Sequence, residues 1–179
     1  MYDDILDFCL NEVGSQKFFE KDLAFDKLLI ERFSDVLEQA AAAEFYTWRS
    51  SIKGRLAEII ILDQFSRNIY RDTPAAFAQD AMALALAQEA VTAGALEALQ
   101  TIDERKFLLM PYMHSESKLI HQQAKKLFEQ YTNADTIEAE LKHKVIIDRF
   151  GRYPHRNKIL GRVSSREEIE FLKQPDSSF

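Results

Sequence analysis

Polar residues in the stretch LDQFSRNIYR, residues 62–71, have the types and spacing needed to bind an anion. On a helix, Asp63, Arg67 and Arg71 recur every four residues and share one face, while Asn68 lies on the adjacent stripe. Two interpretations follow. Asp63 and Arg67 form an ion pair on a solvated face, or Arg67, Asn68 and Arg71 point their donors into a cleft.

A second polar stretch, MPYMHSES, lies at residues 110–117. Pro111 is expected to end one helix, and the next is expected to begin around Ser115, which places His114 near a helix N-terminus. Free backbone N–H groups and the helix dipole favour anions there, and His114 would supply a hydrogen bond or acid/base group. The alternative is that His114 only caps the helix, with Glu116 in its first turn.

The most basic stretch is RFGRYPHRNKILGR, residues 149–162, in a chain whose formal net charge is -6. Gly151 is expected to end a helix, and Pro154 to stiffen the turn that follows. Arginine suits carboxylate or phosphate because its guanidinium is a planar fork of donors. The alternative is an arginine-rich corner paired with Asp and Glu of neighbouring helices. The side chains expected to project from this turn are Arg152, His155, Arg156 and Asn157.

Other catalytic patterns are absent from the sequence. The four His residues show no HExxH spacing and there is no CxxC, so no metal site is expected. No GxGxxG or Walker A loop is present, so no nucleotide cofactor is expected. Ser66 and Ser115 lack the context of a nucleophile elbow.

Hydrophobic spacing and capping residues predict helix over nearly the whole chain, and no window shows the alternation of a strand. Asp22 and Ser164 or Ser165 are the clearest N-terminal caps. Gly94 is expected to end a helix, because glycine commonly follows the last helical residue. We expect about seven or eight helices, stacked as antiparallel hairpins in a single all-α domain that spans residues 1–179. The predicted helical segments are 22–43, 50–70, 72–94, 103–110, 115–131, 135–151 and 164–172.

Composition narrows the classes of function. The chain is 46% hydrophobic and 29% charged, as soluble proteins are, and its apolar runs are too short to span a bilayer. A sequence pI of about 5.3 argues against charge-driven binding of nucleic acid. Cys9 is the one cysteine, and the N-terminal segment is acidic where a signal peptide would be basic, so a cytoplasmic location is expected.

The three polar stretches, together with AAFAQDAMAL and SSREEIEFL, resemble a bacterial family known as domain of unknown function 924. The resemblance covers roughly residues 22–174; the N-terminal DFCL and KFFEKDLAFD depart from a family pattern that is rich in Trp. It implies an all-helical fold similar to the tetratricopeptide-repeat (TPR) superfamily, and it implies no activity. Because the family motifs fall on them, one site is expected from Asp63, Arg67, Asn68, Arg71, His114, Glu116, Arg152, His155, Arg156 and Asn157.

Three functions are compatible with such a site. The leading hypothesis is a pocket for a small anionic ligand, with Arg67, Arg71, Arg152 and Arg156 as its cations. A second is a hydrolase or transferase that uses His114 or His155 as general acid/base. A third is a helical scaffold that binds an acidic peptide or protein segment. Arginines that serve only as structural ion pairs are the remaining alternative.

Overall fold

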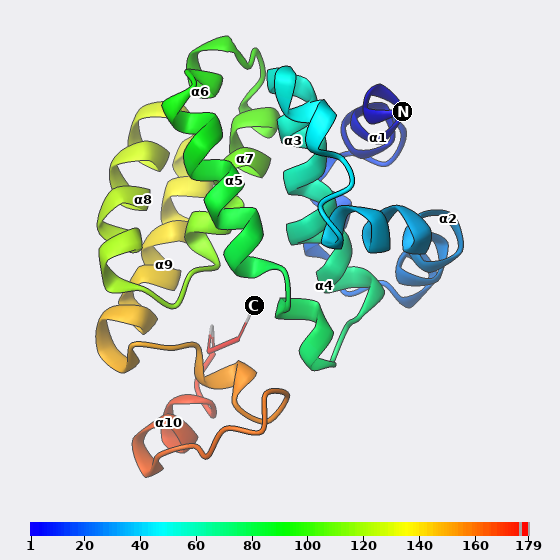
Figure 1. The fold of residues 1–179 in the computed structure, drawn as a ribbon. Coiled ribbons are helices and arrows are strands. Elements are labelled where there is room, and N and C mark those ends of the chain that lie inside the picture. Colours follow the sequence, from blue (N-terminus) through cyan, green and yellow to red (C-terminus); the bar gives the residue numbers. More distant parts are fainter. Residues whose placement is uncertain (176, 179) are drawn as a thin grey trace.

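The chain folds into helices joined by short turns, as the computed structural model of residues 1–175 and 177–178 shows (Figure 1). No strand occurs among these residues, so the prediction of an all-α domain is confirmed. The α-helices are α1 (Tyr2–Asp7), α2 (Leu23–Ala41), α3 (Ile52–Ile60), α4 (Ser66–Ile69), α5 (Asp80–Thr92), α6 (Ala95–Ala98), α7 (Ile102–Met113), α8 (Lys118–Tyr131), α9 (Ala134–Phe150) and α10 (Arg166–Phe171).

The centre of the core is α3 together with the π-helical segment η4 (Ile61–Phe65) that continues it. From Leu56 to Phe65 every residue is buried, most of them are apolar, and a helix with apolar residues on all sides is typically buried in a core. Leu56, Ile60 and Phe65 are accordingly inaccessible to solvent. Helices α1, α2, α5 and α7 pack around this central element. The polar groups that η4 carries are therefore held in the interior.

The second half of the fold is a row of long helices, in which α7 packs against α8 and α8 against α9. In α8 the buried residues are His121, Ala124 and Phe128, which share one helical face, while most of its other residues are solvated. Helices α8 and α9 each bury one stripe and leave the opposite stripe to solvent, whereas α7 is buried on every side from Phe107 to Met113. The arrangement brings the ends of α7 and α8 close to the turn that follows α9.

After α9 the chain turns back beneath the ends of α8 and α9, where Figure 1 shows it in orange. Gly151 makes this turn with a φ of 68°, a left-handed conformation that glycine adopts without strain. Ile146, Ile147 and Tyr153 form a small apolar cluster of their own, separate from the main core. The C-terminal segment is thus fixed by few apolar contacts and depends on polar ones.

Most of the local signals for helix ends are confirmed. Asp22 accepts bonds from the first backbone N–H groups of α2, and Ser165 with Glu168 forms the capping box of α10. Gly94 adopts the left-handed conformation after α5, and α9 ends at Gly151 as predicted.

The prediction that Pro111 ends a helix is wrong. Helix α7 continues through it to Met113, and His114 is the C-terminal cap. Proline removes one backbone hydrogen bond, but only the last residues of α7 follow it, and the N–H of His114 still bonds Met110 O at 3.0 Å. The next helix starts at Lys118 with Ser117 as its cap. His114 and Glu116 therefore lie between two helices, and not at the N-terminus of one.

The segment 72–94 is not one helix either. Pro74–Phe77 forms a single 3-10 turn, η5, and α5 begins only at Asp80. Thr73 makes no side-chain bond to a helix start. The interruption directs Phe77 and Asp80 toward the end of α4, which matters for the site described below.

The finer description of the fold as a TPR-like superhelix, and the limits 1–179 of the domain, remain predictions. Within the described residues, no helix has both the length and the apolar character to cross a membrane.

Candidate functional site

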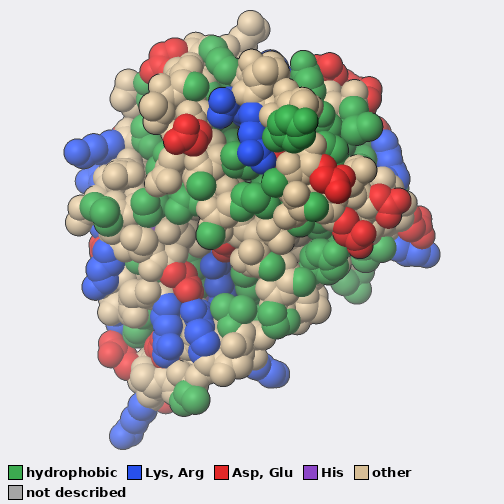
Figure 2. Space-filling view, in the orientation of Figure 1, with side chains coloured by type: hydrophobic (Ala, Val, Ile, Leu, Met, Phe, Trp, Pro, Cys, Tyr) green, Lys and Arg blue, Asp and Glu red, His purple; other side chains and the backbone are tan. Residues whose placement is uncertain are grey.

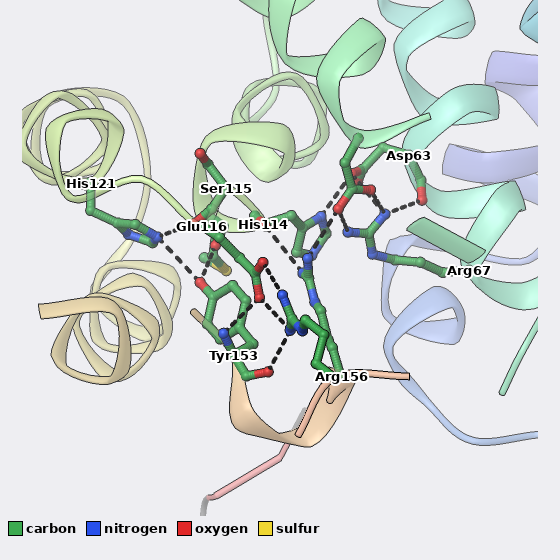
Figure 3. Close-up of polar contacts among 11 residues, drawn as sticks. Asp63, Arg67, His114, Ser115, Glu116, His121, Tyr153 and Arg156 are labelled. Atoms are coloured by element: carbon green, nitrogen blue, oxygen red, sulfur yellow. Dashed lines mark hydrogen bonds and ion pairs between the residues drawn. The ribbon is translucent and has the colours of Figure 1, made fainter. Parts of the chain in front are cut away.

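The residues predicted to form one site make their polar contacts in separate groups. Only some of them meet, at the junction of α4, α5, α7 and the 3-10 turn η6 (Pro154–Arg156) (Figure 3). We call this group the central cluster. Its members are Asp63, Arg67, Asp80, His114 and Arg156.

Asp63 is the most deeply buried member, with 1% of its side chain exposed. Its carboxylate accepts a bond from Gln64 Nε2, and Oδ1 lies 2.7 Å from His114 Nδ1 and 3.2 Å from Arg67 Nη1. Burial alone raises the pKa of Asp63, but Arg67 and His114 outweigh it, and the pKa falls from 3.8 to about 2. The residue lies in η4, and π-helical turns within helices occur frequently at functional sites.

His114 is oriented by this buried carboxylate. Because the carboxylate can only accept, Nδ1 carries the proton, and the neutral ring has its lone pair on Nε2. Burial lowers the pKa of His114, and Arg67 lowers it further, although Asp63 acts in the opposite sense. The ring has no second hydrogen-bond partner in the described part of the chain, and 12% of the side chain is exposed. The imidazole is thus held as a neutral, oriented base.

Arg67 and Arg156 come from distant parts of the chain and share one carboxylate, that of Asp80. Arg67 binds it with both terminal nitrogens, at 2.8 and 3.1 Å, and also donates to Asp63 O at 2.9 Å. Arg156 reaches Asp80 Oδ2 at 3.1 Å and His114 O at 3.1 Å. Asp80 is 21% exposed, more than any other side chain of the cluster.

The Arg156 guanidinium lies between two aromatic rings. Its central carbon is 4.6 Å from the ring centres of both Phe77 and Tyr153, a distance that allows cation–π attraction. Burial lowers the pKa of Arg156, and the nearby Arg67 lowers it further. The Nε of Arg156 is sealed from solvent and has no partner. The arginine is therefore held rigidly while some of its donors remain unused.

A neighbouring cluster surrounds Glu116. The carboxylate binds both terminal nitrogens of Arg162, at 2.6 and 2.9 Å, and accepts the backbone N–H of Tyr153 at 2.7 Å. The Tyr153 hydroxyl donates to Met113 O at 2.5 Å and lies 3.2 Å from Nε2 of the buried His121. These bonds fasten the C-terminal segment to the loop between α7 and α8.

The remaining predicted residues lie apart. Arg71 and Asn68 both donate to Asp26 of α2, and Arg152 binds Glu168 of α10 with two nitrogens. Asn157 donates to Ser164 Oγ at 3.1 Å. Burial lowers the pKa of His155 to about 4, with Arg156 adding to the effect. For Arg71 and Arg152 the structure therefore fits the alternative interpretation, in which each arginine is paired with an acid of the same chain.

Sequence reasoning missed several residues of the site. Asp80 lies in a stretch that carried the family resemblance, but an acid in the first turn of a helix needs no further explanation. Arg162 belongs to the basic stretch, in which no role was predicted for Arg149, Lys158 or Arg162. Tyr153 and His121 had no signal in the sequence, because their bonds connect residues far apart in the chain.

Acidic and basic side chains lie next to one another on the lower part of the face in Figure 2, in keeping with this pairing. Two shallow depressions, of about 400 and 370 Å³, lie elsewhere, beside α8 and beside the start of α2. Among the described residues, no group of three or more His, Cys, Asp or Glu is placed to hold a metal ion.

The comparisons with known proteins give a family but no activity. A family model described as "Bacterial protein of unknown function (DUF924)" matches residues 5–176. The structure of a protein of unknown function from Agrobacterium tumefaciens, ATU0120, is similar, with a TM-score of 0.90 and 36% identity over 96% of each chain. No curated protein matches the chain.

Proposed function

Since this chain belongs to the bacterial DUF924 family, whose description assigns no function, we propose from the geometry that it binds a small anion at Arg67 and Arg156. The observation that supports the proposal is the Asp80 carboxylate, which is partly exposed and bonded by both arginines. A ligand carboxylate or phosphate presents the same acceptors. The ligand would replace Asp80 as the partner of the two guanidinium groups.

Replacement is favoured because the arginines are positioned before a ligand arrives. Phe77 and Tyr153 fix the plane of the Arg156 guanidinium, and Asp63 holds Arg67 through its carboxylate and its backbone oxygen. Little side-chain entropy is then lost on binding. Asp80, at the first position of α5, can turn toward solvent when it is displaced.

The test is a thermal-shift and calorimetric titration with inorganic phosphate, acetate and citrate. Wild type should be stabilised by one of them, and Asp80→Asn should bind it about tenfold or more tightly because the competing charge is gone. Arg156→Lys should weaken binding, since it keeps the charge and loses the planar fork. Arg152→Ala is the matched control, because Arg152 is bonded to Glu168 and should leave binding unchanged.

Two results would contradict the proposal. One is the absence of binding in both wild type and Asp80→Asn at millimolar anion. The other is binding that Arg152→Ala abolishes as completely as Arg156→Lys does. Either would leave the central cluster with a purely structural role, as a set of partly buried ion pairs.

A second candidate, acid/base catalysis at the same cluster, is favoured by the Asp63–His114 hydrogen bond. A buried carboxylate that fixes Nδ1 of a neutral imidazole is the arrangement that prepares Nε2 to accept a proton. Arginines beside it would hold an anionic substrate, and the reaction would be hydrolysis or transfer of an acyl or phosphoryl group. Activity on a panel of such esters that Asp63→Asn and His114→Gln both reduce would support it. Activity unchanged in both variants would exclude it.

A helical scaffold that binds an acidic peptide stays a prediction. No feature of the described surface favours it over the anion site. We also propose a cytoplasmic location, which the free and buried thiol of Cys9 supports. Fractionation of cells that express the tagged protein tests this.

A further inference from the structure

A second feature of the fold, independent of the central cluster, is the depression of about 400 Å³ between α5 and α8. Its size is at the lower end of the range for small-molecule sites, about 300–1,000 Å³. Helix α7 packs against both α5 and α8, and in Figure 1 it passes behind α5. Gln88 and Val91 line the depression from α5, Lys126 and Leu127 line it from α8, and Tyr112 lines it from α7.

Tyr112 is the unusual member of this lining. The residue is only 3% exposed, yet its hydroxyl has no hydrogen-bond partner in the described part of the chain. The oxygen is also not among the unpartnered atoms that are sealed from solvent, and Tyr112 is one of the residues that line the depression. Burial raises the pKa of Tyr112 to about 12, which keeps the hydroxyl protonated. A donor in this position gains free energy from an acceptor that enters the depression.

The charges around the depression favour an anion. The residues that line the depression include no acid. Lys126 is the cation among them, and the other polar lining residues are neutral. Lys126 forms no ion pair with a described residue, whereas the adjacent Lys125 lies 3.8 Å from Glu129. Val91 and Leu127 provide apolar surface beside these polar groups. The lining thus combines a hydroxyl donor, an ammonium group and an apolar wall.

We propose that this depression is a ligand site for a small carboxylate with an apolar body. The carboxylate binds the Tyr112 hydroxyl and the Lys126 ammonium, and the apolar part covers Val91 and Leu127. The proposal does not depend on anion binding at Arg67 and Arg156, which lie outside this lining.

The test is a titration of the 15N-labelled protein with benzoate, followed by backbone amide NMR, with uncharged benzamide as the matched probe. Benzoate should move the amide signals of Gln88, Val91 and Leu127, with a Kd of about 1 mM. Tyr112→Phe and Lys126→Gln should each weaken this binding by about fivefold or more, the effect of losing one bond to a charged group. Lys125→Gln, the neighbouring lysine outside the lining, should leave it unchanged.

Three results would overturn the proposal: no movement of these amides, equal binding of benzamide, or equal effects of Lys125→Gln and Lys126→Gln. Each variant is also checked by circular dichroism so that a loss of fold is not counted as a loss of binding. Shifts confined to residues around Arg156 would assign benzoate to the central cluster alone, and would equally refute a site at α7.

Discussion

Replacing Asp63 by Asn tests whether the buried carboxylate is the charge that organises the central cluster. A pKa of about 2 in the folded chain, against 3.8 ordinarily, corresponds to about 2–3 kcal/mol of stability at neutral pH. Because the folded-state pKa is lowered, this stability is present above pH 4 and is lost as the pH falls through 2. At pH 3 about half of it should remain.

The assay is urea unfolding of wild type and Asp63→Asn at pH 6 and at pH 3. The variant should be less stable by about 2–3 kcal/mol at pH 6 and by about half as much at pH 3. Glu138→Gln is the control, since Glu138 is an exposed residue that pairs with Lys142, and it should cost about 0–1 kcal/mol. A cost for Asp63→Asn no larger than the control, or a cost unchanged between the two pH values, would refute the reasoning.

Three further predictions concern the buried polar groups. Asp80→Ala should cost about 2–4 kcal/mol in urea unfolding because two arginines lose a partner, and acetate should restore part of the thermal stability; a melting temperature that acetate leaves unchanged would contradict this. Tyr153→Phe should lower the free energy of unfolding by about 1–2 kcal/mol, because the hydroxyl bond to Met113 O is lost. Tyr112→Phe loses no internal bond and should change the free energy of unfolding by no more than about 0.5 kcal/mol. Equal costs in urea unfolding would contradict this prediction. Burial lowers the pKa of His143 from 6.5 to about 3, so the unfolded chain is protonated at His143 before the folded chain is, and the free energy of unfolding falls as the pH drops below 6.5. His143→Gln should make the free energy of unfolding fall less steeply with pH. The same slope in wild type and His143→Gln would contradict this prediction.

The parts of the fold that could be predicted from the sequence are those decided by local chemistry. An aspartate such as Asp22 can satisfy the first N–H groups of a helix wherever the rest of the chain lies, and Gly151 can turn left-handed without strain. Pro111 misled because the cost of a proline depends on how much helix follows it. That length is decided by the packing of α7 against its neighbours, which the sequence around Pro111 does not contain.

The candidate site likewise contains contacts that the sequence predicts and contacts that it does not. The helical spacing of Asp63 and Arg67 correctly indicated that they are neighbours, because both belong to one continuous helical stretch. The partners of Arg71 and Arg152 could not be inferred, since an ion pair is formed by whichever acid the fold brings within reach. Arg71 meets Asp26, and the two are 45 positions apart in the chain.

If the proposed anion binding holds, the charges of the central cluster would determine which ligands bind there. Arg67 and Arg156 are matched by Asp63 and Asp80, and the neutral His114 adds no charge. A neutral ligand that displaced Asp80 would leave a buried guanidinium without a counter-charge, which costs several kcal/mol. A carboxylate or phosphate would restore the charge balance when it took the place of Asp80. The arginines of the basic stretch pair with acids from other parts of this acidic chain: Arg152 with Glu168, Arg156 with Asp80 and Arg162 with Glu116. In the proposed function, an outside anion would reach Arg156 in place of Asp80.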